Sequence, residues 1–238
     1  MRGEISVTTE RRLELEILRG SLMLQDLPEE ELKRLALMLR RRTYRRGEVI
    51  FHLGDPGQTL HVVCQGHVKI VLPTESGEEA VLSILGPGEL FGEMALLDGA
   101  PRSATVVALE PVETATLSRQ DFLVLLRSSP AAVEGLLASL ARAVRRLSDE
   151  VTGLMFADLR GRLVRKLLEL AEAHGREHDG ALEIQVPLTQ EELAGMIGAT
   201  RPRVNRLLGF FEDRGVIARS GRRIAILNRE LLERWAGV

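Results

Sequence analysis

The chain has 238 residues, of which 45% are hydrophobic and 28% charged, so it is long enough for two ordinary globular domains. Its net charge of -2 excludes a general attraction to nucleic acid, and its single cysteine, Cys64, excludes an internal disulfide framework and a cysteine-ligated iron–sulfur cluster. No apolar run approaches the roughly 20 residues of a membrane span, and the N-terminus lacks a signal peptide's apolar core. We therefore expect a cytoplasmic protein without membrane partners.

The first half of the chain predicts helix followed by many short strands. Residues 13–39 have a helical pattern, with Pro28 opening a turn ahead of three glutamates. From Thr43 onward, short β-rich runs alternate with glycines, and residues 75–78 are predicted to form a hairpin tip. The runs are 48–53, 59–64, 67–72, 80–85, 104–108 and 112–117. Such a series predicts a small antiparallel barrel or roll.

An anion-binding pattern lies between the runs 80–85 and 104–108. A glycine allows the backbone to approach an anion closely, a glutamate accepts from a sugar hydroxyl, and an arginine meets a phosphate with a charge-assisted fork. A serine next to that arginine adds a further donor. The candidate binding residues are Phe91, Gly92, Glu93, Met94, Arg102 and Ser103. The simpler alternative is that Glu93 and Arg102 pair with each other.

A long helical pattern runs from Pro130 to about Phe156. Its apolar residues recur at spacings close to a heptad, which predicts pairing with the same helix of a second chain. The alternative is packing against the chain's own barrel. The predicted seam consists of Leu136, Leu140, Val144, Leu147, Val151 and Leu154.

A second domain is predicted from Asp158, with a helix at 161–173, an exposed polar loop at 174–180 and a strand at 182–186. Thr189 and Glu192 form a capping-box pattern, and Gly198 ends the helix that follows. Thr200 is then expected to cap a second short helix with Pro202 in its first turn. Two short helices joined by a glycine-containing turn are typical of a helix-turn-helix motif.

Basic residues concentrate in this motif and after it. Between positions 201 and 223 there are seven arginines against Glu212 and Asp213, whereas residues 1–157 contain 18 Lys/Arg and 22 Asp/Glu. Arginine can read guanine and asparagine can read adenine in the major groove, so the outward-facing side chains of the second helix are candidate base readers. Two further strands, 216–218 and 224–227, predict a wing whose arginines meet phosphates. The candidate base readers are Arg201, Arg203, Asn205 and Arg206, and the wing candidates are Arg219, Arg222 and Arg223.

With these motifs in place, the chain from about Leu22 to Leu227 resembles the cyclic AMP receptor protein/FNR (CRP/FNR) family of bacterial transcription regulators. The junction 156–162 also matches a family hallmark. The resemblance implies an α+β fold: an N-terminal antiparallel β-roll of the cyclic-nucleotide-binding jelly-roll type, a long dimerisation helix and a C-terminal winged helix-turn-helix. The expected domains are residues 1–128, 129–157 and 158–238.

The resemblance also implies roles for individual residues. Gly92 and Glu93 would bind the ribose 2′-hydroxyl side of a cyclic nucleotide, and Arg102 and Ser103 its phosphate. Leu147 and Ser148 match a threonine–serine pair that contacts adenine in the family's cyclic AMP binders, and Leu147 cannot make that hydrogen bond. The effector is expected to be cyclic AMP or a related cyclic nucleotide, and no metal is expected.

At the DNA the resemblance implies a homodimer on a near-palindromic double-stranded site, with RNA polymerase as a further partner. Pro202 stands where the family usually has a cytosine-reading glutamate, so the preferred half-site should differ. The expected contact residues are Thr189, Thr200, Arg201, Pro202, Arg203, Asn205, Arg206, Arg222 and Arg223.

Three alternatives remain. A transcription regulator active without cyclic nucleotide is favoured by Leu147, and a cyclic-nucleotide-binding subunit acting on a protein partner would lack the helix-turn-helix. An enzyme could use a metal held by His52, His61 and His67, but these strand histidines lack close ligand spacing with a carboxylate. No catalytic residue is expected.

Overall fold

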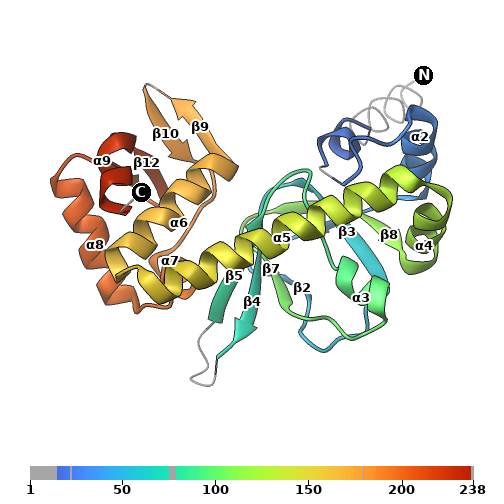
Figure 1. Ribbon diagram of the computed structural model, residues 1–238, viewed down its shortest axis with the longest axis horizontal. Helices are drawn as coiled ribbons and strands as arrows, with labels where there is room; N and C mark the ends of the chain where they lie inside the picture. The colour runs from blue at the N-terminus through green and yellow to red at the C-terminus, as the bar shows by residue number, and fades with distance from the viewer. Residues whose placement is uncertain (1–14, 22, 75–78, 179, 237–238) are drawn as a thin grey trace. The chain divides into compact units, whose positions relative to one another are not determined.

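The computed structural model describes residues 15–21, 23–74, 79–178 and 180–236 (Figure 1). These residues fall into two compact units, one within 1–70 and 84–145 and the other within 71–83 and 146–238. A long helix, α5 (Pro130–Phe156), contributes residues to both. The predicted α+β class is confirmed, because helices accompany antiparallel strand pairs in each part of the chain.

Short strands form two-layered β structure in the N-terminal part, with the sheet orders β1-β8-β3-β6 and β2-β7-β4-β5 (Figure 1). His61 in β3 pairs with Phe91 of β6 on one side and with Thr116 of β8 on the other, so β3 is an inner strand. Phe91, the first residue of the anion-binding pattern, therefore lies directly beside an inner strand. The bounds are β1 Arg40–Tyr44, β2 Val49–Phe51, β3 Thr59–Gln65, β4 Val68–Pro73, β5 Glu79–Leu85, β6 Leu90–Phe91, β7 Thr105–Ala108 and β8 Val112–Ser118.

Three helices cover the apolar core of the first unit. α2 (Glu29–Met38) begins after Pro28 with three glutamates in its first turn, as predicted, and buries one leucine-rich face. α4 (Arg119–Ser128) is capped by the Ser118 hydroxyl and inserts the fully buried Phe122 into the same core. The N-terminal part of α5 adds Leu136 to this cluster. The short helix α3 (Glu93–Asp98) belongs to the anion-binding pattern.

The second unit contains helices packed on a small sheet of order β11-β12-β10-β9. Apolar residues spaced three or four apart on α6, α7 and α8 point into one core, which includes Leu163, Leu193, Val204 and Phe211. The Asp158 carboxylate caps α6 by accepting from the Gly161 N–H at 2.7 Å. The bounds are α6 Leu159–His174, β9 Gly175–His178, β10 Ala181–Ile184, α7 Gln190–Ile197, α8 Arg201–Asp213, β11 Ile217–Ser220, β12 Arg223–Ile226 and α9 Arg229–Ala236.

The structure differs from the sequence predictions at several secondary-structure elements. The polar segment predicted as an exposed loop at 174–180 instead contains β9, whose exposed residues pair with β10 through the backbone alone. Strands β1 and β6 and helices α3, α4 and α9 were not predicted. The predicted hairpin tip at 75–78 lies outside the described residues. The domain bounds expected from the resemblance remain predictions; α4 ends at Ser128 and α5 at Phe156, and the two compact units divide within α5.

Candidate effector site and nucleic-acid interface

The first part of the anion-binding pattern forms a short helix, α3, between two glycines with left-handed backbone angles. Gly92 has φ 85° and precedes α3, and Gly99 has φ 73° and ends it. Since residues with a Cβ rarely adopt such angles, glycine is required at both turns. The backbone N–H groups that begin α3 therefore lie directly after Gly92, and the carboxylate of Glu93 belongs to the first turn.

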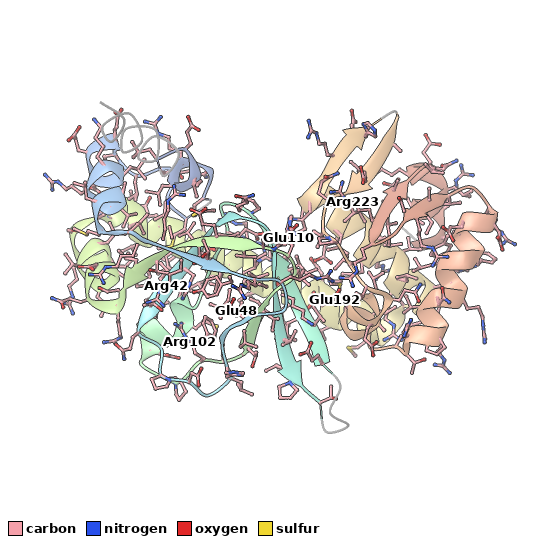
Figure 2. All side chains as sticks on the ribbon, turned by 180° about the vertical axis from the view of Figure 1, so that it is seen from behind. Arg42, Glu48, Arg102, Glu110, Glu192 and Arg223 are labelled. Carbon is pink, nitrogen blue, oxygen red and sulfur yellow. The ribbon has the colours of Figure 1, made fainter. Side chains whose placement is uncertain are left out.

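Arg102 lies inward in the first unit, with its side chain only 4% exposed (Figure 2). Its Nη1 donates to the Gly92 carbonyl at 2.7 Å, and its Nη2 donates to the Thr59 carbonyl at 2.6 Å. The guanidinium carbon lies 4.0 Å from the ring centroid of Phe51, a cation–π contact. The Nε–H of Arg102 is buried and has no hydrogen-bond partner among the described residues. The arginine is thus held in place with one donor still unsatisfied.

Glu93 does not pair with Arg102 in the described part of the chain, so the simpler alternative of a mutual ion pair is not what the structure shows. Burial raises the pKa of the Glu93 carboxyl, and its own backbone N–H and the nearby Arg102 charge offset part of that rise. A half-buried carboxyl of this kind gains from a hydroxyl donor that satisfies its charge.

Of the other predicted members of the pattern, Phe91 is buried and Met94 and Ser103 lie at the surface. The Met94 side chain is exposed, and the Ser103 hydroxyl lies 3.8 Å from the Met94 sulfur. The structure therefore brings Gly92 and Arg102 together, and separately Ser103 and Met94. Leu147 and Ser148 are exposed residues of α5 that belong to the second unit.

Three residues around Arg102 were missed as site residues by the sequence analysis. Thr59 and Phe51 contact its guanidinium, and His61 stacks on Phe91 with ring centroids 4.8 Å apart. Burial, followed by the charges of Arg102 and Arg42, lowers the pKa of His61 to about 3. His61 is consequently a neutral side chain behind the guanidinium, and the described residues contain no group of three His, Cys, Asp or Glu placed to hold a metal ion.

The helix-turn-helix is confirmed in its main features. Thr189 caps α7 in a complete capping box: its hydroxyl accepts from the Glu192 N–H at 3.1 Å, and its own N–H donates to the Glu192 carboxylate at 2.7 Å. Gly198 ends the helix at φ 60°. Thr200 occupies the N-cap position of α8, but the prediction of a side-chain cap is wrong. The reason is local: Pro202 has no N–H, and the Arg203 N–H donates to the Thr200 carbonyl at 3.0 Å.

The outward face of α8 carries the predicted base readers. Arg201, Pro202, Arg203, Asn205 and Arg206 are all exposed, whereas Val204, Leu208 and Phe211 are buried. A hollow of about 360 Å³ lies between the start of α7, the helix α8 and the wing. It is lined by Leu188, Thr189, Gln190, Glu191, Leu193, Arg201, Leu208, Arg219, Gly221, Arg222 and Ile224.

The predicted wing is present as β11 and β12, joined through Gly221 at φ 61°. Two of its three arginines bind acidic groups of the same unit. Arg219 pairs with Glu212, and Arg223 donates to Glu183 at 3.2 Å. Arg222 is exposed beside the hollow. Among the three wing arginines predicted to contact phosphates, Arg222 is therefore the one without an acidic partner in the described part of the chain.

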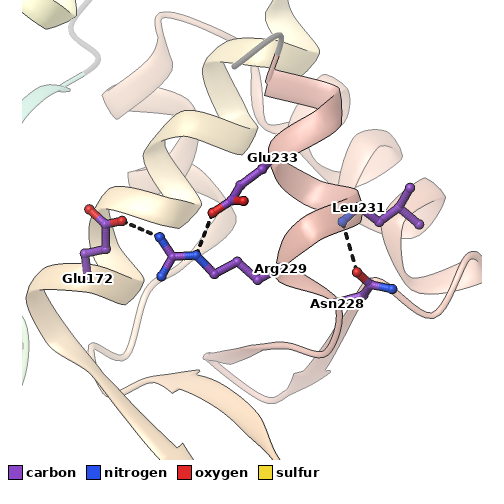
Figure 3. A network of polar contacts seen from close by, with 5 residues as sticks. All are labelled: Glu172, Asn228, Arg229, Leu231 and Glu233. Atoms are coloured by element: carbon purple, nitrogen blue, oxygen red, sulfur yellow. Dashed lines mark hydrogen bonds and ion pairs between the residues drawn. The ribbon is translucent and has the colours of Figure 1, made fainter.

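Helix α9 packs against α8. Trp235 stacks on Phe211 of α8, with ring centroids 5.4 Å apart. Figure 3 shows Arg229, at the start of α9, between Glu172 of α6 and Glu233 of α9, with both hydrogen bonds at 2.6 Å. The Asn228 side chain caps α9 by accepting from the Leu231 N–H. α9 thus contacts both α8, through Trp235 and Phe211, and α6, through Arg229 and Glu172.

The long helix α5 carries two different apolar stripes. Leu136 is buried in the first unit's core and Leu140 packs against it, so the N-terminal end of the predicted seam belongs to the chain's own core. The side chain of Leu154 lies outside the described residues. The stripe left exposed consists of Leu137, Val144, Leu147, Val151 and Met155. No single helix of the described chain is long and apolar enough to cross a membrane. Arg119–Ser128 and Pro130–Gly153 together have the length and composition for a span, but the pair is bent by 110°.

Two family models match the chain: the cyclic nucleotide-binding domain over residues 41–129 and the Crp-like helix-turn-helix domain over residues 161–235. The chain is 34% identical over 221 residues to the CRP-like cAMP-activated global transcriptional regulator of Mycobacterium tuberculosis, covering 93% of this chain and 99% of that protein. It is 36% identical over 219 residues to the cyclic AMP receptor protein of Thermus thermophilus, covering 92% and 98%.

The solved structure of the c-di-GMP responsive global regulator CLP of Xanthomonas campestris matches with a TM-score of 0.70 at 25% identity, covering 84% of this chain and 99% of that one. Two of these three similar proteins are named as global regulators, and the third as a cyclic AMP receptor protein. The chain therefore belongs to the CRP/FNR family of transcription regulators and combines a cyclic nucleotide-binding domain with a Crp-like DNA-binding domain.

Proposed function

We propose that this regulator is switched by a cyclic nucleotide, with cyclic AMP as the first candidate, and that it has no catalytic activity. The observation that carries the proposal is Arg102, a buried cation held beside Gly92 with an unpartnered Nε–H. A buried donor without a partner is costly, and a phosphate oxygen would satisfy it. The relatives from Mycobacterium tuberculosis and Thermus thermophilus are both named for cyclic AMP.

The residues present fit a cyclic phosphodiester. The ligand would supply one delocalised negative charge and a ribose 2′-hydroxyl. Arg102 would donate to the phosphate, with Ser103 and the N–H groups after Gly92 as further donors. Glu93 would accept from the ribose hydroxyl, with Phe91 and Met94 flanking these groups. The proposal needs no metal ion.

The base of the cyclic nucleotide would be recognised by residues of α5. Leu147, which is 60% exposed, has no hydrogen-bonding side chain, so we propose that the base is contacted by Ser148 of the second copy in the dimer. The regulator of similar fold from Xanthomonas campestris is described as responsive to c-di-GMP, a different cyclic nucleotide. A preference for cyclic GMP or another cyclic nucleotide is thus the outcome that would replace cyclic AMP in this proposal.

We further propose a cytoplasmic homodimer formed through α5, with domains at 1–128, 129–157 and 158–238. The exposed stripe from Leu137 to Met155 supports the dimer, because burying such an apolar stripe against a second helix is energetically favourable. Two copies of α8 would then read a near-palindromic site with half-sites about 34 Å apart. RNA polymerase is the expected further partner.

On the DNA, the exposed arginines of α8 are the proposed base readers, and Arg222 at the wing tip is a proposed phosphate contact. The residues proposed to lie close to the backbone of the duplex are Thr189, Thr200 and Arg223. Pro202 would face the bases without a hydrogen-bonding side chain. The hydroxyl of Thr189 already serves the capping box, so its contribution would come through its position rather than as a free donor. The direct readers are Arg201, Arg203, Asn205 and Arg206.

The test is the affinity for a duplex selected from a randomised library, measured by fluorescence anisotropy with and without cyclic AMP. Coupling free energies of this kind are about 1–3 kcal/mol, so we expect the nucleotide to tighten binding about 5- to 150-fold. Equal affinity in both conditions would favour the second candidate, a regulator active without cyclic nucleotide, which Leu147 supports.

A further inference from the structure

Four side chains from three elements form a chain of polar contacts across the DNA-facing side of the second unit. Gln190, the first residue of α7, donates from Nε2 to the Asn205 Oδ1 at 3.1 Å. Arg219 of β11 donates from Nη1 to the same Asn205 oxygen at 3.2 Å. The other terminal nitrogen of Arg219 pairs with Glu212 of α8. We call these residues the Asn205 network; they connect α7, the reading helix and the wing.

The chemistry of arginine fixes which way the Asn205 amide faces. A guanidinium has only donors, so the atom of Asn205 that faces Arg219 has to be the carbonyl oxygen. Gln190 then has to present its NH₂ group to that oxygen, as it does. An amide oxygen has two lone pairs, and both are used here. Asn205 is left with its two Nδ2–H donors for contacts with a ligand.

This arrangement changes what Asn205 can read. An asparagine reads adenine by accepting from N6 and donating to N7, which requires a free amide oxygen. With that oxygen held by Gln190 and Arg219, Asn205 can only donate. Guanine offers two acceptors, N7 and O6, on its major-groove edge, whereas adenine offers one acceptor beside a donor. A donor-only Asn205 therefore favours guanine.

Glu212 keeps Arg219 in this position. The two side chains are each less than one-third exposed, and hydrogen bonding to Arg219 lowers the pKa of the Glu212 carboxyl. Because its charge is paired with Glu212, Arg219 is oriented toward Asn205 rather than toward solvent. Arg222, two residues beyond β11, makes no contact with Asn205 among the described residues and provides a comparison.

We propose that Gln190 and Arg219 are positioning residues that hold Asn205 as a hydrogen-bond donor only, so that Asn205 selects guanine over adenine at one position of each half-site. This inference rests on the proposed DNA-reading role of α8. It adds a determinant of sequence preference that lies outside the reading helix, in the wing and at the start of α7.

The experiment is selection from a randomised duplex library with the full-length dimer, followed by affinity measurement on single-base variants. Asn205→Ala identifies the base pair that Asn205 reads: the base preference at that position of the half-site should be lost, while the preferences at the other positions are kept. There the parent protein should prefer guanine to adenine about tenfold, within the discrimination expected of a specific base contact. The double variant Gln190→Ala/Arg219→Ala frees the amide oxygen of Asn205, and should therefore shift the base preference at that position toward adenine.

Arg222→Ala is the matched control for the loss of a wing charge, and should weaken binding to all sequences alike. An unchanged guanine preference in Gln190→Ala/Arg219→Ala, with thermal unfolding like that of the parent, would overturn the inference. A parent preference for adenine at the Asn205 position would also overturn it. If the parent selected no sequence at all, the proposed DNA-reading role itself would fail, which is a distinct result.

Discussion

The Arg102 guanidinium and the Gly92 backbone occupy adjoining space so closely that no side chain fits between them. Arg102 donates from Nη1 to the Gly92 carbonyl at 2.7 Å, and a Cβ added to Gly92 would collide with that same nitrogen. The added atom would also lie 3.2 Å from the Thr59 carbonyl, the second acceptor of Arg102. Glycine at position 92 is therefore favoured by its φ, and a side chain there would displace the arginine.

Gly92→Ala tests this relationship, with Gly99→Ala as its matched control. Both glycines have left-handed φ angles, so each substitution should lower the free energy of unfolding by about 1 kcal/mol or more. Only Gly92→Ala displaces Arg102, because a Cβ on Gly99 would approach nothing closer than the Arg119 side chain at 3.9 Å. Calorimetric titration should show loss of cyclic-nucleotide binding in Gly92→Ala alone. Equal affinities in the two variants would contradict the account.

The low pKa of His61 should make stability depend on pH. His61 has a pKa of about 3 in the folded protein against 6.5 for an unperturbed histidine, so the unfolded state binds a proton that the folded state does not. The contribution of neutral His61 to the free energy of unfolding is complete above about pH 6.5, and it is lost as the pH falls from 6.5 toward 3. Between pH 7 and pH 5 the loss is about 2 kcal/mol.

Urea denaturation at pH 7 and pH 5 measures this loss, with His61→Gln as the comparison. The free energy of unfolding of the parent should fall by about 2 kcal/mol more than that of the variant. If both proteins lose the same amount, the folded His61 is not kept neutral by its surroundings.

The exposed stripe of α5 should determine the oligomeric state. Val144 and Leu147 are 63% and 60% exposed, and a charge at either position would be buried in the proposed helix pair at a cost of several kcal/mol. Val144→Asp and Leu147→Asp should therefore give monomers by light scattering. Val124→Asp, at a 50% exposed position on α4, should leave a dimer. Monomers for the Val124 variant, or dimers for the α5 variants, would place the interface elsewhere.

The two threonines at helix starts should differ in their effect on stability. Thr189 makes both hydrogen bonds of a capping box, so Thr189→Ala should lower the free energy of unfolding by about 1 kcal/mol. Thr200 makes no side-chain cap, and Thr200→Ala should cost only a few tenths of a kcal/mol by comparison. Chemical denaturation of the two variants would show equal losses if the described caps were incorrect.

Features that depend on neighbouring residues in the sequence could be predicted. The capping box at Thr189, the helix end at Gly198 and the buried face of α8 follow from local hydrogen bonding and helical spacing. The glycine turn at position 92 follows from residue type, whereas the role of Arg102 remains a prediction.

Features set by contacts between distant residues could not be predicted. Thr59 and Phe51 lie 43 and 51 positions before Arg102, and no local pattern marks them as its partners. Leu136 and Leu137 are equally apolar neighbours on α5, and only the packed core shows that the first is buried and the second exposed. The acidic partner of Arg223 likewise comes from β10, 40 residues away.

The most direct test of the central claim is a calorimetric titration of the purified protein with cyclic AMP and then cyclic GMP, repeated on Arg102→Ala. The account predicts saturable binding of cyclic AMP by the parent protein, and loss of that binding in Arg102→Ala, which should retain weak nonspecific DNA binding. Binding of cyclic AMP by Arg102→Ala with the affinity of the parent, or no binding of either nucleotide by the parent, would contradict it.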